Sequence, residues 1–138
     1  MRDRVVRVVL AVWAVASVQL GIWAMFAPRS FFDDYPGFGR HWVRVDGPYN
    51  EHLVRDFGAL NLALAVVTIA ALVTLSRPMV IAVAVAWLAW SVPHLVYHLR
   101  HLDVFSTGDK VVNVFLLGSL PVLAVVVLVL TLQRPART

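Results

Sequence analysis

Residues 78–103 read PMVIAVAVAWLAWSVPHLVYHLRHLD. Apolar residues dominate this stretch until Pro93, after which His94, His98 and His101 follow. These three histidines are spaced i, i+4 and i+7, so on a helix they lie on one narrow stripe. An apolar run of this length predicts a membrane-spanning helix, and the histidines at its polar end are candidate functional residues.

The whole chain shares this apolar character. It has 138 residues, of which 60% are hydrophobic and 14% charged, with a mean hydropathy of +0.78. This composition is too apolar for a soluble domain of this size, so we expect a single membrane domain covering residues 1–138. The net charge is +4, but the basic residues are spread along the chain, which argues against a nucleic-acid partner. Because cysteine is absent, a metal site would have to use histidine, carboxylate or backbone oxygen.

Three further apolar stretches complete the predicted fold. Residues 8–26, 57–75 and 111–132 are each long enough to cross a hydrocarbon core of about 30 Å at ~1.5 Å per residue. A cleaved signal peptide is the alternative for the first stretch, with Ala14-Val15-Ala16 as a small-residue cleavage site. The apolar run continues to Phe26, however, which favours a retained helix. With residues 78–102, the sequence predicts an all-α, integral membrane, antiparallel four-helix bundle.

Two connections differ sharply in length. Residues 76–78 form a very short turn, which makes the helices on either side antiparallel neighbours. Residues 27–47 form the longest connection, which is rich in turn residues and in aromatic residues. Aromatic residues at this density next to a membrane helix usually lie at headgroup level, so we expect a lid or a short interfacial helix. The aromatic residues of this connection are Phe31, Phe32, Tyr35, Phe38 and Trp42.

Arginine and lysine near the helix ends predict the orientation. One side carries six arginines in very short segments: Arg2, Arg4, Arg7, Arg77, Arg134 and Arg137. The basic residues on the other side are diluted over longer segments that also hold most of the acids. The positive-inside tendency therefore predicts a multi-pass plasma-membrane protein with both termini cytoplasmic. The aromatic connection and all five histidines then lie on the extracytoplasmic side.

A second polar cluster begins the helix that precedes the short turn. It consists of Glu51, His52, Arg55 and Asp56. Counting ~1.5 Å per residue from the turn, Asp56 and His98 both lie roughly 30 Å away, and His52 lies level with His101. His94 lies deeper, at roughly 24 Å. We therefore expect the two clusters to face each other, with Asp56 close to His98.

Imidazoles and carboxylates on facing helices are typical of a metal or cofactor site. They can hold Zn, Mn or Fe, and a histidine pair across two helices can ligate a haem. This interpretation predicts a redox-linked module in the membrane. Its metal ligands would be His52, Asp56, His94, His98 and His101, with Glu51, Arg55 and Arg100 in support.

Two alternatives use the same residues without a metal. In the first, the charged residues form an ion-pair cap at the water boundary of a structural or accessory subunit. In the second, the histidines line a pocket for a lipid or quinone headgroup beneath the aromatic lid. Few polar side chains occupy the cytoplasmic half, which favours a one-sided pocket over a channel. Expected partners are the bilayer, a quinone, another membrane protein or a second copy of the chain, and no reaction is indicated.

Two segments carry a resemblance to known proteins. GPYNEHLVRDFGALNLALA (residues 47–65), followed by VPHLVYHL (residues 92–99), resembles uncharacterised small four-helix membrane proteins of actinobacterial type. The pattern R-x2-G-A-L-x-L-A-L from Arg55 to Leu64 is similar to the DoxX-like superfamily, whose better-known members accompany quinone-linked sulfur oxidation. The first resemblance implies a four-helix membrane protein, and the second implies no residue-by-residue transfer of activity.

Overall fold

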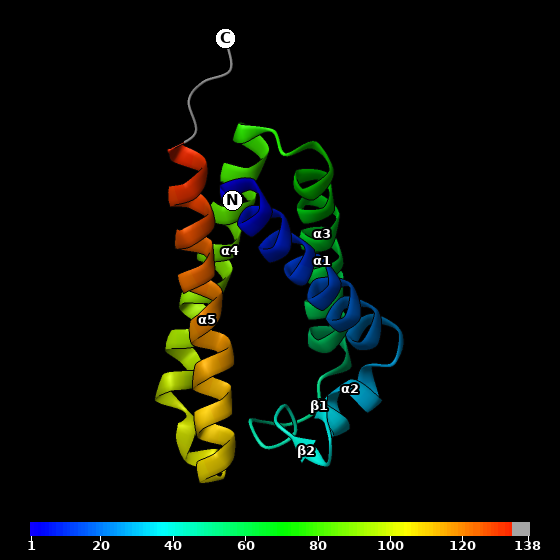
Figure 1. Ribbon diagram of the computed structural model, residues 1–138. Helices are drawn as coiled ribbons and strands as arrows, with labels where there is room; N and C mark the ends of the chain where they lie inside the picture. The colour runs from blue at the N-terminus through cyan, green and yellow to red at the C-terminus, as the bar shows by residue number, and fades with distance from the viewer. Residues whose placement is uncertain (134–138) are drawn as a thin grey trace.

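The computed structural model describes residues 1–133, which are all-helical apart from one small hairpin (Figure 1). The elements in these residues are α1 (Arg2–Phe26), α2 (Pro28–Asp34), β1 (Pro36–Gly37), β2 (Arg40–His41), α3 (Glu51–Thr74), α4 (Arg77–Arg100), the 3-10 turn η1 (Leu102–Val104) and α5 (Thr107–Leu132). Within the described residues, α1, α3, α4 and α5 are long and apolar enough to cross a membrane. This finding confirms the four predicted apolar helices.

The helix ends follow from local capping. α3 begins at Glu51, before the apolar stretch 57–75, because the Asn50 side chain accepts a 3.1 Å hydrogen bond from the Leu53 amide. α5 begins at Thr107, earlier than predicted, because Ser106 caps the Asp109 amide in the same way. Each capping side chain satisfies one of the amides that a helix start leaves unpaired.

The long helices pack in two pairs. α1 packs along α3 and α4 packs along α5, whereas α3 and α4 contact each other less extensively. The α1–α3 crossing is close at Gly58, where an added Cβ would lie 2.5 Å from the Met25 amide nitrogen. Small residues permit this kind of approach between apolar helices. Figure 1 shows the pairs close together near the α3–α4 turn and separated near α2 and the hairpin.

An aromatic stack joins the two pairs. Trp13 of α1 lies on Trp87 of α4 with ring centroids 4.5 Å apart, and both side chains are buried in the main apolar cluster. The Trp87 indole N–H donates a 3.2 Å hydrogen bond to the Thr68 hydroxyl of α3. These contacts link α1, α3 and α4 near the middle of the molecule.

Arginines close the end that carries the α3–α4 turn, called here the turn end. Arg2 donates to the Gln133 carbonyl at 3.2 Å, and Arg77 donates to the Leu132 carbonyl at 3.1 Å. Cations near carbonyls at a helix C-terminus are favourable. The chain start and the end of α5 therefore lie together. Arg134 and Arg137, which contributed to the predicted orientation, lie outside the described residues.

The aromatic connection lies at the opposite end of the molecule. Its first part is α2, in agreement with the expected short helix. Residues 35–50, which we call the strap, then form a hairpin that the sequence did not predict. Pro36 pairs with His41 and Gly37 with Arg40, and residues 37–39 turn the chain with positive φ angles. We call this end of the molecule the strap end.

Candidate functional site

The α4 histidines separate into a pair and an outlier. His94 and His98 have ring centroids 4.7 Å apart, and His94 stacks on Trp90 at 4.8 Å. His101 instead stacks on Tyr97 at 4.1 Å, and its Nδ1 lies 2.8 Å from the Tyr97 carbonyl oxygen. The reason is that α4 ends at Arg100 and His101 takes non-helical backbone angles. The expected stripe of three histidines therefore holds only for its first two members.

The α3 cluster is paired within its own helix and with α1. His52 Nε2 lies 3.3 Å from an Asp56 carboxylate oxygen, and the two side chains are 87% and 61% exposed. Arg55 pairs with Glu51 at 2.8 Å and also donates to the Met25 carbonyl. In the described part of the chain no contact joins Asp56 to His98. The expected contact was wrong because α3 follows α1 and α4 follows α5 away from the short turn.

The predicted metal ligands do not form one centre. Residues 1–133 contain no group of three or more histidine, aspartate or glutamate side chains arranged to hold a metal ion. His94 and His98 come from one helix, His52 and Asp56 from another, and His101 turns to Tyr97. Arg100 is exposed at the end of α4. This arrangement gives no support to a Zn, Mn, Fe or haem site.

The structure reveals a different group of polar atoms, each buried and without a hydrogen-bond partner among the described residues. Asp33 Oδ1 of α2 is one such atom, on a carboxylate whose other oxygen pairs with Arg29. The others are Trp13 Nε1, Ser17 Oγ, Ser91 Oγ, His98 Nδ1 and Asn113 Oδ1. They come from α1, α4 and α5, and we call this set the polar column. Ser91 is 1% exposed and Asn113 is 2% exposed. Buried polar groups in proteins are nearly always paired, so this set indicates a missing partner.

The polar column runs from the middle of the molecule toward the strap end. Ser17 lies four residues after Trp13, and Ser91 lies four residues after Trp87, the tryptophan on which Trp13 stacks. Ser91 lies about 21 Å along α4 from Arg77, and His98 lies about 31 Å along it, at ~1.5 Å per residue. Ser91, His94 and His98 are spaced i, i+3 and i+7, so they share one face of α4.

Other buried polar groups of the long helices have partners. Asn61 donates to the Phe57 carbonyl at 2.9 Å, and Thr131 donates to the Val127 carbonyl at 2.7 Å. Both use the common hydrogen bond to a carbonyl one turn earlier in the helix. Buried polar groups in these helices therefore do not all lack hydrogen-bond partners, whereas the atoms of the polar column do.

The strap covers the end of the polar column. Trp42 of the strap is buried, with ring centroids 6.4 Å from Phe105, and Phe105 lies 6.3 Å from His98. Asp109 of α5 accepts hydrogen bonds from Trp42 Nε1 at 2.9 Å and from Ser106 Oγ at 2.7 Å, and it pairs with Arg40. We call this set of contacts to Asp109 the latch.

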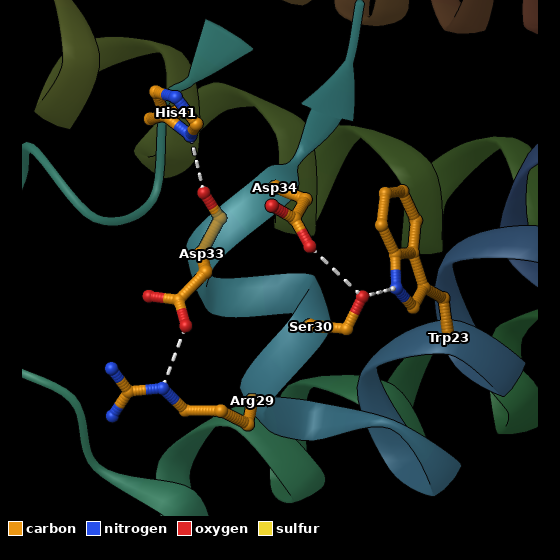
Figure 2. A network of polar contacts seen from close by, with 6 residues as sticks. All are labelled: Trp23, Arg29, Ser30, Asp33, Asp34 and His41. Atoms are coloured by element: carbon orange, nitrogen blue, oxygen red, sulfur yellow. Dashed lines mark hydrogen bonds and ion pairs between the residues drawn. The ribbon is translucent and has the colours of Figure 1, made fainter. Parts of the chain in front are cut away.

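A network around α2 holds the other side of the strap (Figure 2). The His41 Nδ1 atom lies 2.5 Å from the Asp33 carbonyl oxygen, and Arg29 pairs with the Asp33 carboxylate at 2.7 Å. Ser30 accepts from the Trp23 indole and donates to Asp34 (Figure 2). His41, the one histidine outside the α3 and α4 clusters, therefore fastens the hairpin to α2.

Several functional candidates were missed in the sequence. Ser91 lies in register with His94 and His98, and this spacing was a usable signal. Asn113 and Ser17 are single polar residues in long apolar runs, which marks them as unusual without indicating where they point. Asp109 and Trp42 lie 67 residues apart, so only the folded chain shows that they meet.

Comparison with protein families, with curated proteins and with solved structures finds no match to this chain. The site is therefore interpreted from its own geometry.

Proposed function

We propose that this chain is a multi-pass protein of the plasma membrane. α1, α3, α4 and α5 cross the bilayer as an antiparallel four-helix bundle, with both termini cytoplasmic and the strap extracytoplasmic. Their apolar surfaces, the short α3–α4 turn and the arginines at the turn end support this arrangement. The large exposed valines, leucines and phenylalanines of these helices are then covered by lipid.

We further propose that the polar column binds the headgroup of an amphipathic membrane molecule, of the lipid or quinone class. The observation that carries this proposal is the set of buried, unpartnered polar atoms on three helices. Leaving a buried donor or acceptor unpaired costs about 1–3 kcal/mol. A bound headgroup removes that cost at each atom that it reaches, whereas residues 1–133 bring no three metal ligands together.

The groups in the polar column are suited to binding by hydrogen bonds. The serine hydroxyls donate and accept, the indole N–H donates, and the asparagine oxygen accepts. The Trp90–His94 stack and the half-buried His98 add flat apolar surface beside them. The function supported best is recognition and retention of a headgroup, and the strap shields the bound molecule from water.

Purification in a mild detergent, followed by solvent extraction and mass spectrometry, tests this function. We expect a co-purified lipid or quinone in the wild-type protein and less of it in Ser91→Ala. His52→Ala is the matched control, because His52 is exposed and, among residues 1–133, its side chain pairs with Asp56 alone. Equal ligand content in all three proteins, or a near-stoichiometric metal lost in His98→Ala, would overturn the proposal.

A further inference from the structure

We propose that a groove on α5 binds an anionic phospholipid of the bilayer, with the lipid phosphate at Lys110 and an acyl chain against Val111, Val114 and Phe115. This lipid site is separate from the polar column, and it rests only on the membrane-spanning part of the proposed function. It follows from the shape of the groove, from the unpaired charge at its polar end and from the place of that charge along α5.

The groove is a hollow in the surface of the first turns of α5. It has a volume of about 440 Å³ and is lined by Lys110, Val111, Val114 and Phe115. Val111 is 67% exposed and Phe115 is 72% exposed, so the apolar lining is open to its surroundings. Gly118 continues this face one turn further, and an added Cβ there would meet nothing within 4 Å. The groove therefore offers an extended apolar surface with room beside it for a linear chain.

Lys110 places a cation at one end of this surface. α5 begins at the strap end (Figure 1), and Lys110 directly precedes residues 111–132, which contain no charged residue. In a membrane-spanning α5 this lysine lies at the level of the lipid headgroups. A lysine at that level lays its carbon chain on apolar surface while its ammonium group reaches the phosphates.

The Lys110 ammonium group has no ion-pair partner among residues 1–133. No residue one helical turn before or after it is charged. Asp109 is its neighbour in sequence, but the latch already engages that carboxylate. An anion from outside the described chain would therefore complete the charge, and a lipid phosphate at the end of an acyl chain matches both parts of the groove.

Two further cations are exposed at the strap end. Arg44 of the strap and Arg100 of α4 also lack an ion-pair partner in the part of the chain that the structure describes. The exposed carboxylate of Asp103 offsets part of this charge. Neither arginine lines the groove. The arginines therefore attract an anionic headgroup to this end in general, whereas Lys110 determines where it binds.

A second copy of the chain is the alternative occupant of the groove. In a symmetric pair with its two-fold axis along the membrane normal, the same patch of each copy faces the other. The two Lys110 ammonium groups would then meet at the same level, and the groove lining holds no carboxylate to separate them. Charge complementarity therefore favours the phospholipid.

The groove and the polar column occupy different faces of α5. Val111 and Phe115 lie two residues before and after Asn113, so at ~100° per residue each points nearly opposite to it. A lipid in the groove therefore leaves the polar column unoccupied, and the two sites can be tested independently.

Native mass spectrometry of the detergent-purified chain tests the charge. The probes are short-chain phosphatidylglycerol and phosphatidylcholine. We expect the wild-type protein to bind phosphatidylglycerol about fivefold more tightly, the usual effect of one cation near an anionic lipid surface. Lys110→Gln should lose this preference, and Arg100→Gln, the matched control, should retain it. Equal binding of the two lipids by the wild type, or an equal loss in both variants, would overturn the role of Lys110.

The same measurement tests the apolar contact. Phe115→Ala should weaken the binding of both lipids severalfold, whereas Leu116→Ala, which removes an exposed side chain outside the groove, should not. Equal effects of these two variants, or a wild-type dimer that Phe115→Ala dissociates, would overturn the groove as a lipid site.

Ser91→Ala separates this proposal from the function of the polar column. We expect it to keep the full preference for phosphatidylglycerol while it loses the co-purified ligand of the polar column. If the wild type shows no preference but still retains a ligand that depends on Ser91, the groove proposal alone fails. If the preference is present and no such ligand co-purifies, the function proposed for the polar column fails instead.

Discussion

Trp42 of the strap donates a 2.9 Å hydrogen bond to Asp109 of α5, although 67 residues separate them. This contact ties the segment between α2 and α3 to the α4–α5 pair. The two helix pairs are separated toward this end (Figure 1), so the latch connects the strap to the α4–α5 pair there.

The latch gives a first prediction. Asp109→Asn removes the charge that pairs with Arg40 and weakens the hydrogen bond from Trp42, so we expect a lower free energy of unfolding. Faster amide hydrogen exchange in residues 35–50 is the direct measurement. Asp103→Asn is the matched control, because it makes the same chemical change at an exposed carboxylate outside the strap. Unchanged exchange in Asp109→Asn would show that the latch does not hold the strap.

A second prediction concerns the α1–α3 crossing. The Cβ of a Gly58→Ala variant would lie 2.5 Å from the Met25 nitrogen, so α1 and α3 must move apart, and we expect destabilisation of about 1–3 kcal/mol. Gly118→Ala of α5 is the matched control, since nothing lies within 4 Å of its added Cβ. In thermal unfolding measured in detergent, we expect a lower midpoint for Gly58→Ala and not for Gly118→Ala. Equal midpoints would contradict the close crossing.

A third prediction concerns pH. Burial raises the pKa of the Tyr35 hydroxyl above its ordinary value. Because the unfolded chain then ionises at lower pH than the folded one, this burial contributes stability that is present below about pH 10 and is lost as pH rises through the folded pKa. Tyr35→Phe should therefore flatten the fall in stability above that pH, measured by unfolding at a series of alkaline pH values. An unchanged slope would contradict a raised pKa of the Tyr35 hydroxyl.

The sequence predicted the four apolar helices and the short α3–α4 turn because apolar runs and prolines act locally. Counting residues from the α3–α4 turn placed Asp56 and His98 at the same distance along their helices. Two residues at the same distance along neighbouring helices need not be in contact. Which helices pack together depends on the shape of their surfaces, such as the one around Gly58. That surface packs α3 against α1. The predicted site was therefore divided between two helix pairs.

Other parts of the site depend on the ends of elements. His101 leaves the histidine stripe because α4 stops one residue earlier, and a boundary cannot be placed that finely from sequence. The strap hairpin depends on positive φ angles at residues 37–39. Of these three residues, only Gly37 and Gly39 are of a type that predicts a positive φ from sequence. Ser91 could have been predicted as a site residue from sequence, since it continues the helical spacing of His94 and His98.

The central claim is that a headgroup lies in the polar column. Photolabelling of the wild-type protein in nanodiscs, with a neutral glyceride that carries a diazirine next to its hydroxyl, tests it most directly. Peptide mapping should place the label on residues 91–98 of α4 and residues 13–17 of α1, with loss of that label in Ser91→Ala. Labels confined to the lipid-facing surface of α5, around Val122 and Val125, would contradict the claim.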